Sequence, residues 1–109
     1  LAVLLPEIVL AEIAAGISRG TGQIALAQRL VRVLRRVPQF RFIPVEHTLG
    51  DLAAEIAASH RIRGCDAVYV ALAQQRDAIL ITLDRQQRER VPTYIVARSP
   101  AEELAQMER

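Results

Sequence analysis

The apolar run at residues 78–83, AILITL, is the feature that most constrains the fold. Its length and β-branched content are typical of a strand, and its apolar residues do not alternate with polar ones. Such a run predicts a central parallel strand that is covered on both faces. A predicted helix precedes the run at residues 64–75, and a short polar helix follows it at residues 84–90. This order indicates helices packed on a parallel sheet.

The rest of the chain repeats this alternation of strand-like and helical segments. Further strands are predicted at residues 1–6, 40–46 and 93–97, and further helices at residues 7–18, 22–37, 48–60 and 99–106. We expect the starts of these four helices to be marked, in order, by Pro6, by Thr21, by Thr48 with Asp51, and by Ser99 with Glu102. The alternation predicts a single α/β domain over residues 1–109, with a three-layer α/β/α fold and a mostly parallel sheet.

The composition excludes several classes of protein. The chain is 51% hydrophobic and lacks tryptophan, so it is too apolar to be disordered and must build an aliphatic core. Its formal net charge of +2 does not by itself indicate nucleic-acid binding. Cys65 is the only cysteine, and no apolar run is long enough to cross a bilayer, so we expect a cytoplasmic protein with no membrane partner. His47 and His60 lack metal-ligand spacing with Cys65, which argues against zinc.

Three acidic residues are candidates for a functional site. Asp84 follows the apolar run at its carboxyl end, Asp66 lies in the first turn of the preceding helix, and Glu12 lies in the first predicted helix. Ligands of open α/β sheets collect beyond the carboxyl ends of the strands. Two of the three also have a structural explanation, because Asp66 would interact favourably with the helix macrodipole and Asp84 would cap the next helix.

Glu12 is harder to explain structurally, because the residues one turn away from it are apolar, namely Ile8, Val9, Ala15 and Gly16. A carboxylate in such surroundings is costly unless an arginine or a metal ion pairs with it. Three converging carboxylates would suit Mg²⁺ or Mn²⁺, which prefer hard oxygen ligands. An ion held there could neutralise charge on a nucleic-acid phosphate.

Two stretches of the sequence resemble the PIN domain family, the fold of the VapC-type toxin ribonucleases. LPEIVLAEI, at residues 5–13, is similar to the family's strand and helix with an acidic residue, which maps to Glu12. RGCDAVYVALAQQRDAILITLD, at residues 63–84, resembles the family's Asp-Ala helix and the strand that ends in Thr-x-Asp. It maps the family's residues to Asp66, Thr82 and Asp84. In the order of its elements, the resemblance covers essentially the whole chain.

The resemblance implies a divalent-metal-dependent endoribonuclease, a hydrolase that cleaves RNA phosphodiesters with Mg²⁺ or Mn²⁺ as its cofactor. Glu12, Asp66 and Asp84 would be catalytic metal ligands, and the hydroxyl of Thr82 would support their cluster. The resemblance also implies an antitoxin protein as a possible partner.

The family ordinarily opens with a strand that bears an early aspartate, and no residue of this sequence matches it. We therefore expect an N-terminally truncated PIN-like fold. Either the sequence is a fragment whose parent is a nuclease, or the protein has lost this strand, which should weaken metal binding and leave unpaired backbone in the sheet. A partner chain or a rearranged sheet could fill the gap, so we expect a homo-oligomer or an unusual topology. Two alternatives stay open. The chain could be a catalytically silent PIN-like module that binds RNA or a protein partner, or a small α/β module that acts only in dimerisation.

Arginines that flank the acidic positions are candidates for holding the RNA backbone. Arg61 and Arg63 precede Asp66, and Arg85, Arg88 and Arg90 follow Asp84; we expect substrate binding by Arg61, Arg63, Arg85 and Arg88. A second group on the helix predicted at 22–37 is more simply explained as a solvated outer face, namely Arg29, Arg32, Arg35 and Arg36.

Overall fold

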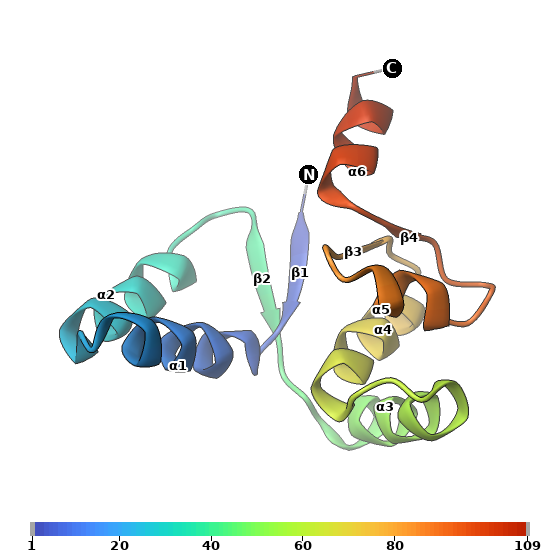
Figure 1. Cartoon of the computed structure of the whole chain (residues 1–109), viewed down its shortest axis with the longest axis horizontal. Helices are drawn as coiled ribbons and strands as arrows, with labels where there is room; N and C mark the ends of the chain where they lie inside the picture. The colour runs from blue at the N-terminus through green and yellow to red at the C-terminus, as the bar shows by residue number, and fades with distance from the viewer. Residues whose placement is uncertain (1, 109) are drawn as a thin grey trace. The chain divides into compact units, whose positions relative to one another are not determined.

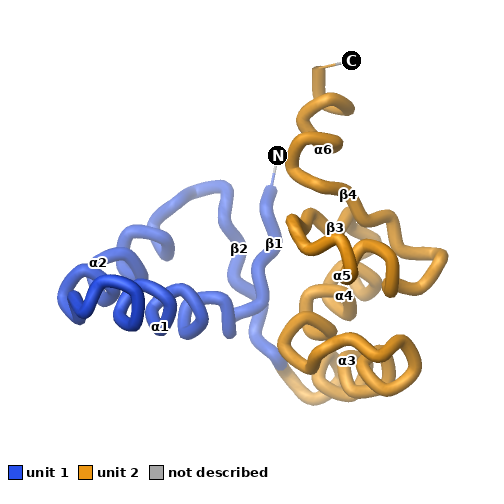
Figure 2. The backbone as a smooth tube through the Cα atoms, in the orientation of Figure 1, with its two compact units in different colours: residues 1–45 blue, residues 46–109 orange. Residues whose placement is uncertain are grey.

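The computed structural model describes residues 2–108, and Figure 1 shows their helices and strands. The chain divides into two compact units, residues 1–45 and residues 46–109 (Figure 2). Each unit contains one pair of parallel strands together with helices, and each is described by itself.

The N-terminal unit consists of two parallel strands and the helical hairpin that connects them. Strand β1, Val3–Pro6, pairs with β2, Phe40–Ile43, in a register that places Val3 opposite Phe40. Helices α1, Val9–Thr21, and α2, Ile24–Arg35, pack against each other (Figure 1). The most buried residues of the unit are Pro6, Leu10 and Ala27.

Two helix starts predicted for this unit are wrong. Pro6 is the last residue of β1, and because the N–H of Glu7 still donates to the carbonyl of Ile43 at 2.8 Å, the chain leaves the strand pair only afterwards. Thr21 is the last residue of α1 rather than the cap of α2. Gly22 ends α1 instead, since its left-handed backbone (φ 71°) lets its N–H donate to the carbonyl of Ser18.

The C-terminal unit is built on two helices, α3, His47–His60, and α4, Gly64–Arg76. They pack through buried aliphatic side chains, namely Leu49, Ala53 and Ile56 of α3 and Ala67, Val70 and Ala71 of α4. Strand β3, Leu80–Ile81, pairs in parallel with β4, Ala97–Arg98. Helix α5, Arg85–Arg90, connects these strands, and α6, Pro100–Met107, follows β4 (Figure 1).

Strand β3 is shorter and more exposed than the sequence predicts. Leu80 is buried, but Ile81 is 43% exposed and Leu83 is 84% exposed. Within the described part of the chain, β3 forms a sheet with β4 alone. The prediction of a central strand covered on both faces is therefore wrong for this segment, because only one edge of β3 is paired within the described residues and Ile81 is not covered.

The cap of α3 also differs from the prediction. The helix begins at His47, so Glu46 occupies the capping position, and its carboxylate accepts hydrogen bonds from the N–H groups of Thr48 at 3.0 Å and Leu49 at 2.8 Å. The capping box predicted for Thr48 and Asp51 is wrong for this reason. The one predicted at the last helix is confirmed, with Ser99 and Glu102 bonded reciprocally.

The predicted fold class is confirmed at the level of an α/β chain with parallel strands, and the structure is compatible with the three-layer arrangement. No helix in residues 2–108 combines the length and the apolar character that crossing a membrane requires.

The capping bonds of Glu46 predict a pH-dependent contribution to stability. The N–H groups of Leu49 and Thr48 lower the pKa of this carboxyl below its ordinary value of 4.5. A lowered folded-state pKa stabilises the protein above the ordinary pKa, and this contribution is lost as the pH falls through the lowered value. Glu46→Gln should therefore lower the melting temperature at neutral pH, and its difference from the wild type should shrink in acid.

Thermal unfolding followed by circular dichroism across this pH range measures the effect. The matched control is Glu55→Gln, an exposed glutamate of the same helix with no capping bond. A difference between Glu46→Gln and the wild type that stays constant with pH would contradict the capping role.

Candidate functional site

Asp84 is held at the carboxyl end of β3 by hydrogen bonds from its own neighbourhood. It is the N-cap of α5, and its Oδ1 accepts a hydrogen bond from the N–H of Gln87 at 3.2 Å. The N–H of Asp84 donates to Oγ1 of Thr82 at 3.0 Å. Thr82 therefore fixes the backbone that carries Asp84, and the supporting role of its hydroxyl in a carboxylate cluster stays a prediction.

Asp66 lies in the first turn of α4, where a carboxylate interacts favourably with the positive end of the helix. Its side chain is half-buried, and its Oδ2 lies 3.8 Å from Nε of Arg63. Because Arg63 is exposed, this ion pair is weak and leaves the guanidinium able to exchange one anionic partner for another.

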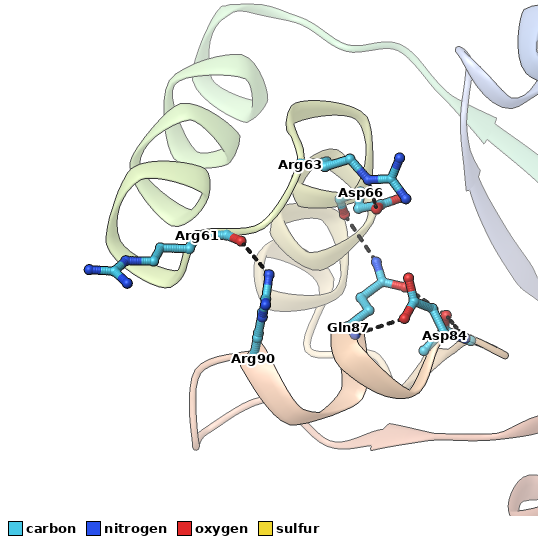
Figure 3. A network of polar contacts seen from close by, with 7 residues as sticks. Arg61, Arg63, Asp66, Asp84, Gln87 and Arg90 are labelled. Atoms are coloured by element: carbon cyan, nitrogen blue, oxygen red, sulfur yellow. Dashed lines mark hydrogen bonds and ion pairs between the residues drawn. The ribbon is translucent and has the colours of Figure 1, made fainter.

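Gln87 connects the segments that carry Asp66 and Asp84. It is the only buried polar residue in the described part of the chain, at 8% exposed. Its side-chain Nε2 donates to the main-chain carbonyl of Asp66 at 3.3 Å, and its Oε1 accepts from the hydroxyl of Thr82 at 2.6 Å. Figure 3 shows the amide between the start of α4 and the start of α5. One side chain thus ties together the two segments of the candidate site.

A small recess of about 40 Å³ lies beside this amide. Asp66, Asp84, Arg63 and Arg90 contribute its charged lining, so two carboxylates and two guanidinium groups share one hollow. Its volume exceeds the roughly 10–15 Å³ that one water molecule needs. The carboxylates supply hard oxygen donors, which fit Mg²⁺ or Mn²⁺ rather than a softer metal.

Glu12 lies in the first turn of α1, in the N-terminal unit. Its side chain is exposed, so the burial cost expected from its apolar neighbours does not arise. No group of three or more His, Cys, Asp and Glu side chains suited to a metal ion occurs among residues 2–108. The structure brings Asp66 and Asp84 to one recess within their unit, and the participation of Glu12 stays a prediction.

The four arginines predicted to bind substrate have different surroundings. Arg63 lines the recess, whereas the side chain of Arg61 points away from Asp66 and Asp84 (Figure 3). Arg85 pairs with Glu89 at 3.1 Å, and Arg88 donates to the main-chain carbonyl of Thr82 at 2.7 Å.

Arg90 also lines the recess, and it donates to the carbonyl of Arg61 at 3.1 Å. This bond ties the end of α5 to the turn between α3 and α4, where Arg61 adopts a left-handed backbone conformation (φ 54°). Of the arginines that flank the acidic positions, Arg63 and Arg90 are thus the two that border the carboxylates.

Gln87 was not predicted as a site residue, although the sequence contains a signal for it. Asp84 and Gln87 have the spacing of a capping box, in which a polar side chain three residues after the cap bonds back to it. In the structure only half of this pattern forms, because the backbone of Gln87 bonds to Asp84 while its amide turns to Thr82 and Asp66.

The chain is similar to known proteins at the level of a family model and of a solved structure. The PIN domain family model matches residues 1–91. The crystal structure of VapBC2 from Rickettsia felis bound to a DNA fragment from their promoter contains a similar chain, with a TM-score of 0.69 and 17% identity. This match covers 90% of the present chain and 74% of the other, and at this identity it shows likeness of fold alone. No curated protein matches the sequence.

The hydrogen bonds of Gln87 predict that Gln87→Leu destabilises the protein by about 1–3 kcal/mol, because the carbonyl of Asp66 and the hydroxyl of Thr82 lose a buried partner. Urea unfolding measures this change. Its matched control is Gln86→Leu at the exposed neighbouring position, which should change stability by less than about 0.5 kcal/mol. Equal effects of the two substitutions would show that the amide does not tie these segments together.

Proposed function

Because this chain belongs to the PIN domain family, we propose that it is a divalent-metal-dependent endoribonuclease of the VapC toxin type, acting on RNA phosphodiesters. The observation that carries this proposal is the recess shared by Asp66 and Asp84, with Arg63 and Arg90 beside them. Carboxylates and arginines in one hollow can attract a cation and a phosphate group together. We propose further that both units form one PIN domain and that Glu12 joins these carboxylates within it.

We propose that Asp66, Asp84 and Glu12 hold the metal, which is Mg²⁺ or Mn²⁺. Such an ion supplies Lewis acidity, which lowers the pKa of water and neutralises negative charge on the phosphate. The chain's own contribution is to fix the carboxylates. Gln87 holds the main chain at Asp66, and Thr82 holds the main chain at Asp84. Partners of this kind, which orient metal ligands without touching the metal, support affinity in metal sites.

The arginines would hold the RNA strand beside the carboxylates. Arg63 and Arg90 line the recess, and their guanidinium groups can donate charge-assisted hydrogen bonds to phosphate oxygens. Arg61, Arg85 and Arg88 remain candidates for contacts further along the strand. In this arrangement the strand is held by its backbone, so the proposal includes no reading of base sequence.

We also propose an antitoxin protein as a partner, and self-association of the chain. The similar fold in VapBC2 supports a two-component assembly. Self-association is supported by β3, whose sheet contains only β4 within the described residues and whose Ile81 is 43% exposed. An exposed apolar strand edge is a surface that proteins commonly cover with another chain.

The site predicts that Asp66→Asn, Asp84→Asn and Glu12→Gln each lower metal-dependent RNA cleavage by roughly a hundredfold or more. The residues that merely orient metal ligands are already worth about 10–100-fold, so the loss of a ligand should cost at least as much. Cleavage of a labelled RNA with millimolar Mn²⁺ measures the activity. Calorimetric titration with Mn²⁺ in the absence of RNA measures binding to the metal site separately.

The matched control is Asp77→Asn. Asp77 is an exposed aspartate whose left-handed backbone (φ 50°) asparagine also adopts, so this change should leave cleavage and Mn²⁺ binding near the wild-type values. Metal-dependent cleavage retained by Asp66→Asn would show that the site is wrongly assigned. A wild-type protein that neither binds Mn²⁺ nor cleaves RNA would instead be the silent binding module.

A further inference from the structure

Three arginines on α2 and at its carboxyl-terminal cap are exposed and form no ion pair with any residue that the structure describes, namely Arg29 and Arg32 of α2 and the cap residue Arg36. Their spacing of three and four residues places them on one face of the helix, which is called the arginine face below. The neighbouring Arg35 behaves differently, because it pairs with Glu7 and lies over the ring of Phe42 at 5.7 Å. Arg29, Arg32 and Arg36 therefore lack the structural contacts that Arg35 makes.

Positive charge is concentrated in the unit that carries this face. Residues 1–45 contain six arginines and two glutamates, whereas residues 46–109 contain eight arginines and ten acidic residues. Helix α2 itself contains no acidic residue. A surplus of this kind on one unit attracts polyanions to it.

Helix stability accounts for only part of the arginine face. Cations near the carboxyl end of a helix interact favourably with the macrodipole, which explains Arg32, Arg35 and Arg36. Arg29 lies near the middle of α2, and like charges at spacings of three and four residues repel each other. The macrodipole thus leaves Arg29 unexplained, and an anionic partner outside the helix would offset its repulsion from the neighbouring arginines.

We infer that the arginine face binds the phosphate backbone of single-stranded RNA, so that the RNA is held at a surface outside the recess of Asp66 and Asp84. The identity of the polyanion as RNA rests on the proposed function. Arg29 and Arg36 lie about 10 Å apart along the helix axis, at about 1.5 Å per residue. A stacked strand carries a phosphate about every 3.4 Å, so the face spans about three phosphates.

The chemistry of the face favours a nucleic-acid backbone over a protein segment. Leu26 and Val33 flank the arginines and are 37% and 53% exposed. Both are aliphatic, and α2 carries no aromatic residue, whereas protein interfaces are commonly anchored by tryptophan and tyrosine. Without aromatic side chains the helix offers no aromatic platform for base stacking, so we expect contacts mainly to the backbone and independent of sequence.

The test is RNA binding by the full chain in EDTA, so that cleavage does not interfere. The probe is a fluorescein-labelled oligouridylate of about 20 nucleotides, followed by anisotropy between about 50 and 200 mM salt. The triple variant Arg29→Gln, Arg32→Gln, Arg36→Gln should bind about tenfold more weakly or worse at low salt. Its slope of log affinity against log salt should be shallower by about 2, at about 0.7 per phosphate contact.

Two controls separate the face from general charge and from loss of folding. The variant Arg19→Gln, Arg41→Gln, Arg76→Gln removes the same charge from exposed positions elsewhere and should keep the affinity and salt slope. The variant Arg29→Lys, Arg32→Lys, Arg36→Lys keeps the charge and should keep most of the slope. Wild-type RNA affinity and slope in the triple glutamine variant would overturn the proposal, as would an equal loss in the first control.

A second probe tests the alternative partner. If the triple glutamine variant loses binding of an amphipathic glutamate–leucine peptide while its RNA binding is unchanged, the face docks a protein and the proposal is wrong. A wrong proposed function would be detected by a different measurement. Asp66→Asn would then leave metal-dependent cleavage unchanged, whereas RNA binding in EDTA would still test the arginine face.

Discussion

The side-chain amide of Gln87 offers one donor group and one acceptor atom, and the structure uses both. The carbonyl of Asp66 can only accept, so the amide nitrogen must face it, and the amide oxygen is then left for the hydroxyl of Thr82. Buried polar groups are costly unless they are bonded, so this orientation is set by its surroundings. The distance between the start of α4 and the end of β3 is thereby fixed by a single side chain, and the two carboxylates come to one recess as a consequence.

The structural role of Asp84 is compatible with the metal-binding role proposed for it. Its Oδ1 caps α5 through the N–H of Gln87. A carboxylate has about four acceptor sites, so one capping bond leaves most of its capacity for a cation. The same holds for Asp66, whose position at the start of α4 suits the helix dipole while its pair with Arg63 is long, at 3.8 Å. The start of a helix is thus a suitable position for a metal ligand, because the backbone already orients the carboxylate there.

Much of the fold could be predicted from the sequence, because helix and strand periodicity are local properties. The helix predicted at residues 64–75 is α4, with bounds of Gly64–Arg76. The wrong predictions concern features that depend on the exact start of a helix or on which strand pairs with another. Glu46 rather than Thr48 caps α3 because the helix starts one residue earlier, and β3 is reduced to two residues because only β4 pairs with it. For the site, the sequence predicted Asp66, Thr82 and Asp84, but the orientation of the Gln87 amide depends on residues 21 and 5 positions away.

The distribution of charge suggests how one small chain can accept a cation and a polyanion. The recess balances Asp66 and Asp84 with Arg63 and Arg90, so a phosphate approaching it does not meet two uncompensated carboxylates. The unpaired arginines of α2 belong to the other unit, where the acidic residues are few. At physiological ionic strength, charges are screened beyond about 8 Å. The arginine face proposed to bind RNA would therefore act mainly at short range, so the spacing of its arginines would matter more than the net charge of the chain.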